Sequence, residues 1–266
     1  MDNTPAKKES SEEMTFWGHL DVLRMSLFRI LGAVIVAFIS CFIVMPHIFD
    51  KFILGPTNSD FFLYKLFATL GQIPLGPDFS DDTFHVDIIN INVASQFMTH
   101  LSISFWLAVV LAFPYIIYEI WRFIRPALLP NEKRNVSSAF LFGTGMFYLG
   151  CLIGYSIVFP LTFRFLTQYT IGHSIENQIN LNSYINMFLL LIFVMGVVFE
   201  LPLLAWVLSK LGLINKAFLR KYRSYAVVVL LILAAVITPS GDPFTLMVVF
   251  LPLYLLYELS IKVVKN

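Results

Sequence analysis

Charged residues and cysteines are scarce in this chain. Only 13% of the 266 residues are charged, whereas 58% are hydrophobic and 16% are aromatic, and the mean hydropathy is +0.78. A soluble domain cannot bury so much apolar surface, so the composition predicts a polytopic membrane protein. The two cysteines, Cys41 and Cys151, fall inside predicted spans, which argues against a disulfide framework and favours packing thiols.

Enzyme and metal-binding motifs are also missing. The chain has no HExxH, GxSxG, P-loop or Rossmann fingerprint, and its five histidines are scattered without metal-ligand spacing. We therefore expect no enzyme activity, no cofactor, no metal site and no nucleic-acid partner. No cleavable signal peptide is visible, because the first apolar run follows a mostly polar segment and is long enough to be a retained helix.

Six apolar segments predict transmembrane helices in an all-α fold. The expected spans are residues 27–46, 99–121, 137–160, 184–208, 225–238 and 244–260. The last two are short for full crossings, so we expect that hairpin to sit in a thinned membrane or to stop short of one face. A polar tail (1–14) then precedes a single six-span domain (15–266).

The second, third, fourth and sixth predicted spans each contain a proline, namely Pro114, Pro160, Pro202 and Pro252. Kinked helices that splay into a concave bundle are the expected result. Between the first two spans, residues 61–70 predict a short interfacial helix and residues 84–93 an extended segment. No internal repeat is evident, which weighs against an inverted-repeat transporter.

Lysine and arginine are distributed unequally between the two sides of the predicted membrane. Fifteen of the 18 lie in the N-terminal segment, the second and fourth loops and the C-terminus. The other side keeps Lys51, Lys65 and Arg164. The positive-inside rule therefore places both termini in the cytoplasm.

One ionisable residue, Glu200, lies in the apolar stretch of residues 187–207. A carboxylate at membrane depth costs about 2.5–3.5 kcal/mol, so we expect it to face the bundle interior, a cavity or a partner. Two interpretations remain open. The carboxyl is protonated and hydrogen-bonded inside the bundle, or it is a polar point kept for a ligand, a partner helix or a proton.

Several carboxylates lie at the predicted cytoplasmic margin. Asp21 and Glu132 have basic neighbours in the sequence, and Glu119 ends the second span. Surface ion pairing, worth about 0–1 kcal/mol, is one interpretation. The other is recognition of a guanidinium group, which carboxylates bind in bidentate pairs that lysine cannot form. Acids around a concave bundle would then select an arginine-bearing segment.

Five motifs in a fixed order resemble those of one family, TatC, the polytopic core of the twin-arginine translocase. The order and spacing match from about residue 14 to residue 260. The motifs are FWGHLDVLR (16–24), FPYIIYEIWRFIRPALLPNEKR (113–134), MGVVFELP (195–202), ITPSGDPFT (237–245) and LYE (256–258).

The resemblance implies a receptor for the twin-arginine signal peptides of folded cargo proteins. It also implies proton-gradient-driven export across the cytoplasmic (inner) membrane, with single-span TatA/TatB-type subunits and further copies of the chain itself as partners. Glu132 matches the family's acid in the second loop, and Arg24 matches the arginine that closes the first motif.

The resemblance assigns further positions more loosely. Glu200 matches the intramembrane glutamate that the family associates with partner-helix docking. Asp242 falls in the turn between the last two spans. Phe97 and Pro56 lie in the first periplasmic loop, where the family carries a phenylalanine and a proline.

The first motif departs from the family's HLxELR pattern. Val22 occupies the acid position and Asp21 precedes it. One residue is about 100° of helix rotation, so Asp21 need not point where the family's glutamate does. Either the local helix is rotated or frayed, or Glu132 and Glu119 carry more of the recognition.

Two other functions compete with this one. A proton-coupled secondary transporter would use Glu200 as its proton site, but few polar residues surround Glu200 in the sequence. A structural subunit of a respiratory complex is the second alternative, but no paired intramembrane histidines suggest haem.

Overall fold

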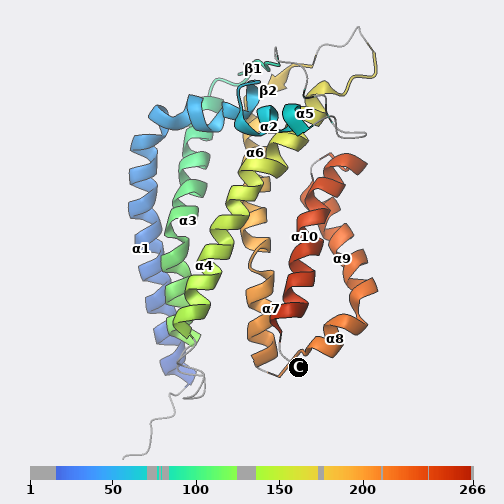
Figure 1. Ribbon diagram of the computed structural model, residues 1–266. Coiled ribbons are helices and arrows are strands. Elements are labelled where there is room, and N and C mark those ends of the chain that lie inside the picture. Colours follow the sequence, from blue (N-terminus) through green and yellow to red (C-terminus); the bar gives the residue numbers. More distant parts are fainter. Residues whose placement is uncertain are drawn as a thin grey trace, which may run out of the picture.

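A computed structural model describes residues 16–70, 77, 79, 84–124, 136–172, 177–210, 212–238 and 240–264, and Figure 1 shows an elongated bundle of helices. The predicted polar tail of residues 1–14 lies outside the described residues. The long helices are α1 (Phe16–Ile48), α3 (Ser95–Ile124), α4 (Val136–Ile153), α6 (Leu181–Val198), α9 (Arg223–Ile237) and α10 (Pro243–Val263). Shorter helices are α2 (Phe62–Leu70), α5 (Phe159–Gln168), α7 (Leu201–Lys210) and α8 (Lys216–Lys221).

Five helical stretches are long and apolar enough to cross a membrane. They are Leu20–Thr57, Ser95–Phe123, Leu141–Gln168, Leu181–Lys210 and Pro243–Val263. The last stretch contains α10, so the expectation of a short final span was wrong: the helix extends beyond the apolar run at both ends. The remaining predicted span corresponds to α9, whose 15 residues cover about 22 Å, less than the roughly 30 Å of a hydrocarbon core.

The prolines lie at different kinds of positions in these helices. Pro114 and Pro252 lie inside α3 and α10. Pro160 follows a π-helical turn, η5 (Gly154–Val158), and belongs to the first turn of α5. Pro202 is the second residue of α7, after a two-residue break in the helix at 199–200. Proline fits a first helical turn because its missing N–H would have no partner there.

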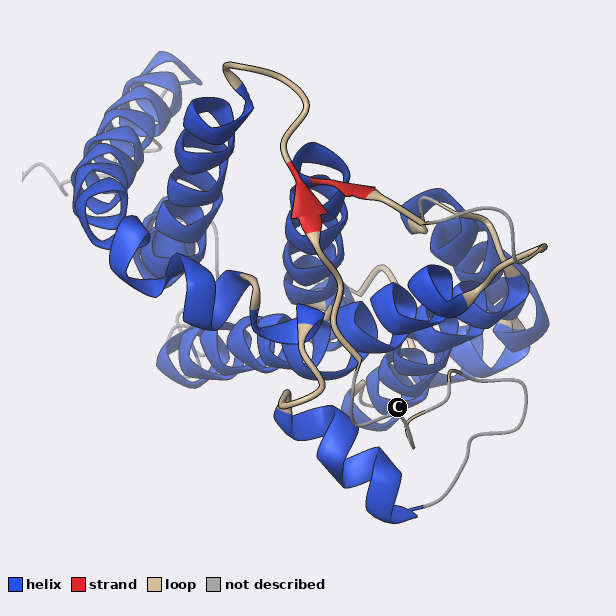
Figure 2. Cartoon of the chain, turned by 90° about the horizontal axis from the view of Figure 1, so that it is seen from above, coloured by secondary structure: helices blue, strands red, loops and turns tan. Residues whose placement is uncertain are grey.

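One end of the bundle, which we call the capped end, carries a layer of short elements. These are η1 (Phe49–Ile53), η2 (Gly55–Thr57), α2, α5, β1 (Ile88–Ile89) and β2 (Ile179–Asn180). The two strands pair in parallel, with Ile88 opposite Ile179. Viewed from above, they lie over the helices (Figure 2). Of the extended segment expected at 84–93, only β1 is a regular strand, and the short helix expected at 61–70 is α2.

The capped end is fastened to the bundle by aromatic side chains and by one arginine. The Tyr184 hydroxyl of α6 donates to the carbonyl of Ile53, and Phe159 and Phe188 pack edge-on and face-on around it. Arg164 of α5 is 1% exposed, and its guanidinium lies 4.6 Å from the Tyr64 ring centre of α2. These contacts pack the short elements against the ends of the long helices.

The α4–α6 contact is close because of a glycine. A Cβ atom on Gly150 would lie 2.5 Å from the Met195 carbonyl oxygen and 2.8 Å from the Phe199 Cβ. No larger residue fits there without moving a backbone. Cys151, next in the chain, and Cys41 are buried free thiols, as the sequence predicted.

Helices α1 and α3 lie side by side along one flank (Figure 1). Pro46 has no N–H, so the carbonyl of Phe42, four residues earlier, loses its usual helical donor. The Nε2 of His100 on α3 lies 2.8 Å from this carbonyl oxygen, and the His100 and Phe42 rings stack with centres 3.9 Å apart. A residue of α3 therefore replaces the hydrogen bond that the proline removes from α1.

Candidate functional site

At the end opposite the cap, α1 and α3 are joined by a buried carboxylate. Glu119 is 1% exposed, and its two oxygens lie 3.6 Å from guanidinium nitrogens of Arg29 on α1 and Arg122 on α3. The Tyr115 hydroxyl donates to Glu119 Oε1 at 3.2 Å. Two cations and a phenol thus already stabilise this charge, and Glu119 connects the two helices.

Asp21 is much more accessible than Glu119. Its side chain is 74% exposed and pairs only with Arg24, one turn further along α1, at 3.4 Å among the described residues. The helix is continuous from Phe16 through this motif. Val22 is half-buried, which means that the position of the family's acid is turned away from the exposed side of Asp21.

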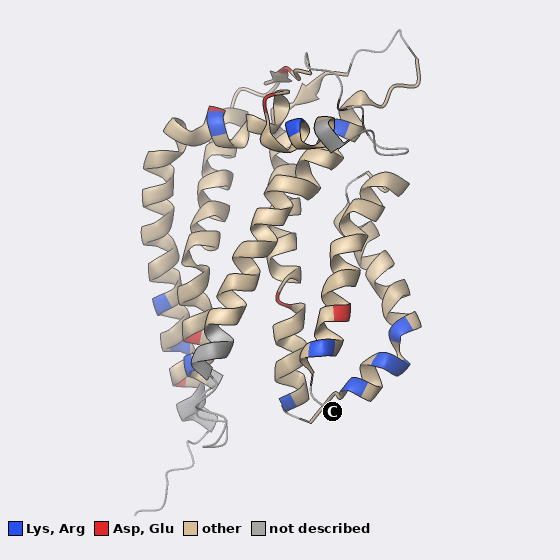
Figure 3. Ribbon diagram, in the orientation of Figure 1, with Lys and Arg blue, Asp and Glu red and all other residues tan. Residues whose placement is uncertain are grey.

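Glu132 lies outside the described residues, in the segment 125–135 between α3 and α4. The structure therefore brings Arg24 and Asp21 together, and Glu119 close to Arg29, but does not place Glu132. Figure 3 shows the described lysines and arginines gathered towards the two ends of the bundle, with the middle nearly free of them.

Glu200 occupies the break between α6 and α7. It is 8% exposed, and neither carboxylate oxygen has a hydrogen-bond partner among the described residues. The carboxylate lies against Gly143 of α4, where a Cβ atom would be 3.2 Å from Glu200 Oε2 and 2.6 Å from Leu203 Cδ2. A buried carboxyl without a partner is costly, which marks Glu200 as an unusual polar group.

Asp242 begins α10 as its N-cap. Its Oδ1 accepts from the Thr245 backbone N–H at 2.7 Å, and its Oδ2 accepts from the Ser240 hydroxyl at 2.5 Å. Partial burial acts to raise the pKa of Asp242, but the hydrogen bonds from Ser240 and Thr245 outweigh it and leave the pKa below its usual range. This carboxylate fixes the turn between α9 and α10.

Phe97 and Pro56, assigned loosely from the sequence, both lie at the capped end but in different surroundings. Phe97 is exposed in the first turn of α3. Pro56 is buried in η2, and its carbonyl accepts from the Tyr64 hydroxyl at 2.8 Å. Pro56 is thus part of the framework of the cap, whereas Phe97 offers an apolar surface.

Sequence reasoning missed some of the groups that surround these acids. Tyr115 and Arg122 stand four residues before and three after Glu119, a helical spacing that could have revealed both. Arg29 and Gly143 gave no local signal, because each meets its carboxylate from another helix. Among the described residues, no group of three or more His, Cys, Asp or Glu side chains is arranged to hold a metal ion.

Comparison with known proteins identifies the family. Residues 18–252 match the family model described as TatC, Sec-independent protein translocase protein. The TatC protein of Blattabacterium sp. subsp. Periplaneta americana is 37% identical over 258 residues, covering 96% of this chain and 97% of that protein. The TatC protein of Helicobacter pylori strain J99 is 35% identical, covering 93% of this chain and 87% of that protein.

Solved structures agree with the sequence matches. A crystal structure of the twin-arginine translocase receptor TatC aligns with a TM-score of 0.71 and 28% identity, covering 92% of this chain and 97% of that one. A second, in DDM, aligns with a TM-score of 0.73 and 29% identity, covering 93% and 100%.

These matches do not support the alternative of a secondary transporter. The family is a protein translocase component and not a known enzyme. The several long apolar helices of this chain indicate a multi-pass membrane protein. The chain belongs to the TatC family of Sec-independent protein translocase proteins.

Proposed function

We propose that this protein is the receptor and core subunit of a twin-arginine translocase. It binds the twin-arginine signal peptides of folded proteins. It exports these proteins across the cytoplasmic membrane, driven by the proton gradient. Membership of the TatC family, over nearly the whole chain, is the observation that carries this proposal. Single-span TatA/TatB-type subunits and further copies of the chain are its partners.

The signal's arginine pair is read at the end of the bundle opposite the cap. Asp21 supports this role because its carboxylate is exposed and, within the described part of the chain, pairs only with the equally accessible Arg24, a weak surface interaction that an incoming guanidinium can replace. Glu132 of the second loop is the other acid of the site. Glu119 acts indirectly, because its ion pair with Arg29 of α1 holds α1 against α3.

The test is binding of two labelled signal peptides, one with Arg-Arg and one with Lys-Lys, to the purified protein. We expect Arg-Arg to bind more tightly, and Glu132→Ala and Asp21→Asn to reduce this preference, because a carboxylate binds guanidinium in a bidentate pair. Asp60→Asn is the matched control, since Asp60 is an exposed carboxylate at the capped end whose one ion-pair partner among the described residues is the exposed Lys65.

Equal binding of the two peptides by the unaltered protein would contradict the receptor function. An Arg-Arg preference that survives both acid variants would leave the function standing and remove these two residues from the site.

We further propose that Glu200 docks a polar group of a partner's single span. The support is its burial, its lack of a hydrogen-bond partner among the described residues and its position in a helix break. At rest, the carboxyl packs against Gly143. A partner that supplies a hydrogen bond at this depth would remove the cost of an unsatisfied buried carboxyl.

Glu200→Ala should weaken co-purification of the partner subunits while the isolated protein stays folded. Glu200→Gln keeps hydrogen-bonding capacity and should retain more of the complex. Gly143→Ala is a second variant, because its Cβ would displace Leu203 and the carboxylate without deleting it. Unchanged co-purification in Glu200→Ala would exclude the docking role.

The proposed topology has six spans, with α9 as a short crossing, both termini in the cytoplasm and the capped end outside. Because both native cysteines are buried, single introduced cysteines can report it. An impermeant thiol reagent added outside intact cells should label Asp60→Cys and Ser240→Cys but not Lys216→Cys. Labelling of Lys216→Cys from outside would contradict the crossing of α9.

A further inference from the structure

The short helix α8 and the residues that follow it form a basic surface at the end of the bundle opposite the cap (Figure 3). We call residues 216–225 the α8 corner. Residues 201–241 contain no aspartate or glutamate, and their five basic residues are Lys210, Lys216, Arg220, Lys221 and Arg223. All but the first of these five lie in the α8 corner, so this segment does not balance its own positive charge.

Helix α10 fixes the α8 corner in place and neutralises one of its cations. The Tyr257 hydroxyl donates to the Leu219 carbonyl of α8 at 2.7 Å, and Glu258 forms an ion pair with Arg223 at the start of α9. Both side chains belong to the LYE motif of residues 256–258, which neither signal recognition nor partner docking, as proposed above, uses. The motif therefore holds α8 and the start of α9 against α10.

The other three cations of the α8 corner have no acid beside them. Among the described residues, Lys216, Arg220 and Lys221 form no ion pair. Lys216 and Arg220 are four residues apart, so they lie on the same side of α8, where like charges destabilise a helix. An anion from outside the chain would remove this repulsion.

Aromatic side chains beside these cations make the α8 corner amphipathic. Phe218, Tyr222 and Tyr225 form a row whose successive ring centres lie 4.6 Å and 5.9 Å apart, and these side chains are 46%, 40% and 70% exposed. Exposed aromatic rings together with basic side chains are typical of the interface between lipid headgroups and acyl chains. A soluble anion would contact only the cations, whereas a phospholipid contacts both groups.

The length of α9 brings the α8 corner within reach of the headgroups. The 15 residues of α9 cover about 22 Å, about 8 Å less than a hydrocarbon core. In the proposed topology α9 crosses the membrane, and a short crossing is accommodated by local thinning of the bilayer and by flanking basic side chains. Only Tyr222 separates α8 from α9, so the cations of α8 flank this crossing.

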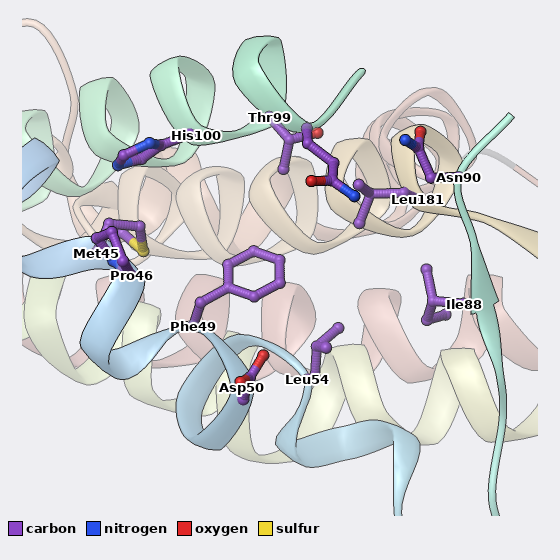
Figure 4. A pocket seen from close by; sticks show the side chains of 11 residues that line it. Met45, Pro46, Phe49, Asp50, Leu54, Ile88, Asn90, Thr99, His100 and Leu181 are labelled. Carbon is purple, nitrogen blue, oxygen red and sulfur yellow. The ribbon is translucent and has the colours of Figure 1, made fainter. Parts of the chain in front are cut away.

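The capped end has a cavity of different character. This cavity of about 420 Å³ lies between α1, α3 and β1, and Figure 4 shows Asp50 and His100 on different sides of it. Among the described residues that line it, Asp50 is the one Asp, Glu, Lys or Arg, so its formal charge is negative. Lys51 and Lys65 do not line the cavity. An anionic lipid is therefore better matched by the α8 corner than by this cavity.

We propose that the α8 corner binds anionic phospholipids of the cytoplasmic leaflet, of the phosphatidylglycerol type. The phosphates accept hydrogen bonds from Lys216, Arg220 and Lys221, and the glycerol and upper acyl chains pack over the aromatic row. The bound lipids hold the start of α9 at the thinned part of the membrane. The choice of leaflet rests on the proposed topology, whereas the lipid chemistry rests on the side chains alone.

The experiment is native mass spectrometry of the delipidated full-length protein, titrated with phosphatidylglycerol and phosphatidylcholine of identical acyl chains. We expect phosphatidylglycerol to bind roughly tenfold more tightly, because only this lipid carries a net negative charge. The double variant Arg220→Gln with Lys221→Gln should remove most of this preference. Arg220→Lys with Lys221→Arg keeps both charges and should retain it.

The matched control is Lys51→Gln with Lys65→Gln, which also removes two positive charges but at the capped end. We expect this variant to keep the preference for phosphatidylglycerol. An equal loss in the control would mean that the overall charge of the protein, and not the α8 corner, attracts the lipid.

Three other results would overturn the proposal. Equal binding of the two lipids by the unaltered protein would exclude recognition of the negative charge. A preference left unchanged by Arg220→Gln with Lys221→Gln would place the anionic lipid elsewhere. Soluble glycerophosphoglycerol binding as tightly as the lipid would exclude the contribution of the aromatic row. These readouts involve neither signal peptides nor thiol labelling, so they can fail independently of the proposed receptor function and topology.

Discussion

Replacing Gly150 by alanine tests the packing on which the position of Glu200 depends. The added Cβ would lie 2.5 Å from the Met195 carbonyl oxygen and 2.8 Å from Phe199 Cβ and Cγ. Both obstacles are backbone or stiff side-chain atoms of a neighbouring segment, so no flexible group can simply rotate away. Normal contact requires a separation of about 3.5 Å, so α4 and α6 must move apart by about 1 Å.

The expected cost follows from overpacking. Forcing an extra carbon into a packed core costs about 1–3 kcal/mol. In Gly150→Ala this cost is partly offset by the helix propensity of alanine, which exceeds that of glycine by about 1 kcal/mol. Gly145→Ala on the same helix is the matched control, because its Cβ meets no atom within 4 Å. This variant therefore keeps only the favourable contribution of helix propensity. The two variants should therefore differ by about 1–3 kcal/mol.

Unfolding of both purified variants in detergent measures this difference. We expect Gly150→Ala to unfold first and Gly145→Ala to equal or exceed the unaltered protein. Phe199 directly precedes Glu200, so Gly150→Ala should also weaken partner co-purification. Equal midpoints for the two variants would refute the close α4–α6 contact and, with it, the geometry described for Glu200.

Three further changes test other parts of the molecule. Arg164→Lys should destabilise the protein by about 2 kcal/mol and increase proteolysis near α2, because an ammonium cannot stack on the rings of the cap as guanidinium does. Asp242→Ala should cost about 1 kcal/mol of helix capping at neutral pH. Because the folded-state pKa of Asp242 lies below its ordinary value of 3.8, this loss should be full above that value and vanish as the pH falls through the folded-state pKa. Val22→Glu restores the family's acid position and should strengthen binding of the Arg-Arg peptide; no gain in binding would mean that Asp21 already replaces that acid.

The helical parts of the fold were predictable because they depend on local apolar length. The predicted spans correspond to α1, α3, α4 with α5, α6 with α7, α9 and α10. The β1–β2 pair was not predictable: each strand has only two residues, and they lie about ninety residues apart in the sequence. The end of the third span was missed because it also depends on contacts between segments far apart in the sequence. α5 continues to Gln168, and it is stabilised there by aromatic packing against another helix rather than by its hydropathy.

The candidate site was predictable in its residue types but not in its pairings. Glu119 stood out as an acid at the end of a span, yet it forms an ion pair with Arg29, ninety residues earlier in the chain. The isolation of Glu200 was evident in the apolar run around it, but its contact with Gly143 required the packing of α4 against the helix break. Non-local contacts of this kind leave no periodic trace in the sequence.

Charge counting constrains how an arginine pair can be recognised at this end of the bundle. Residues 16–29 and 119–134 contain six lysines and arginines but only three carboxylates, Asp21, Glu119 and Glu132. The overall field of these segments therefore repels a cationic signal rather than attracting it. Since Glu119 already pairs with two guanidinium groups, selection of an arginine pair in the proposed receptor function rests on short-range bidentate contacts of the remaining acids. Discrimination between arginine and lysine, and not general attraction of positive charge, is the property that this arrangement can provide.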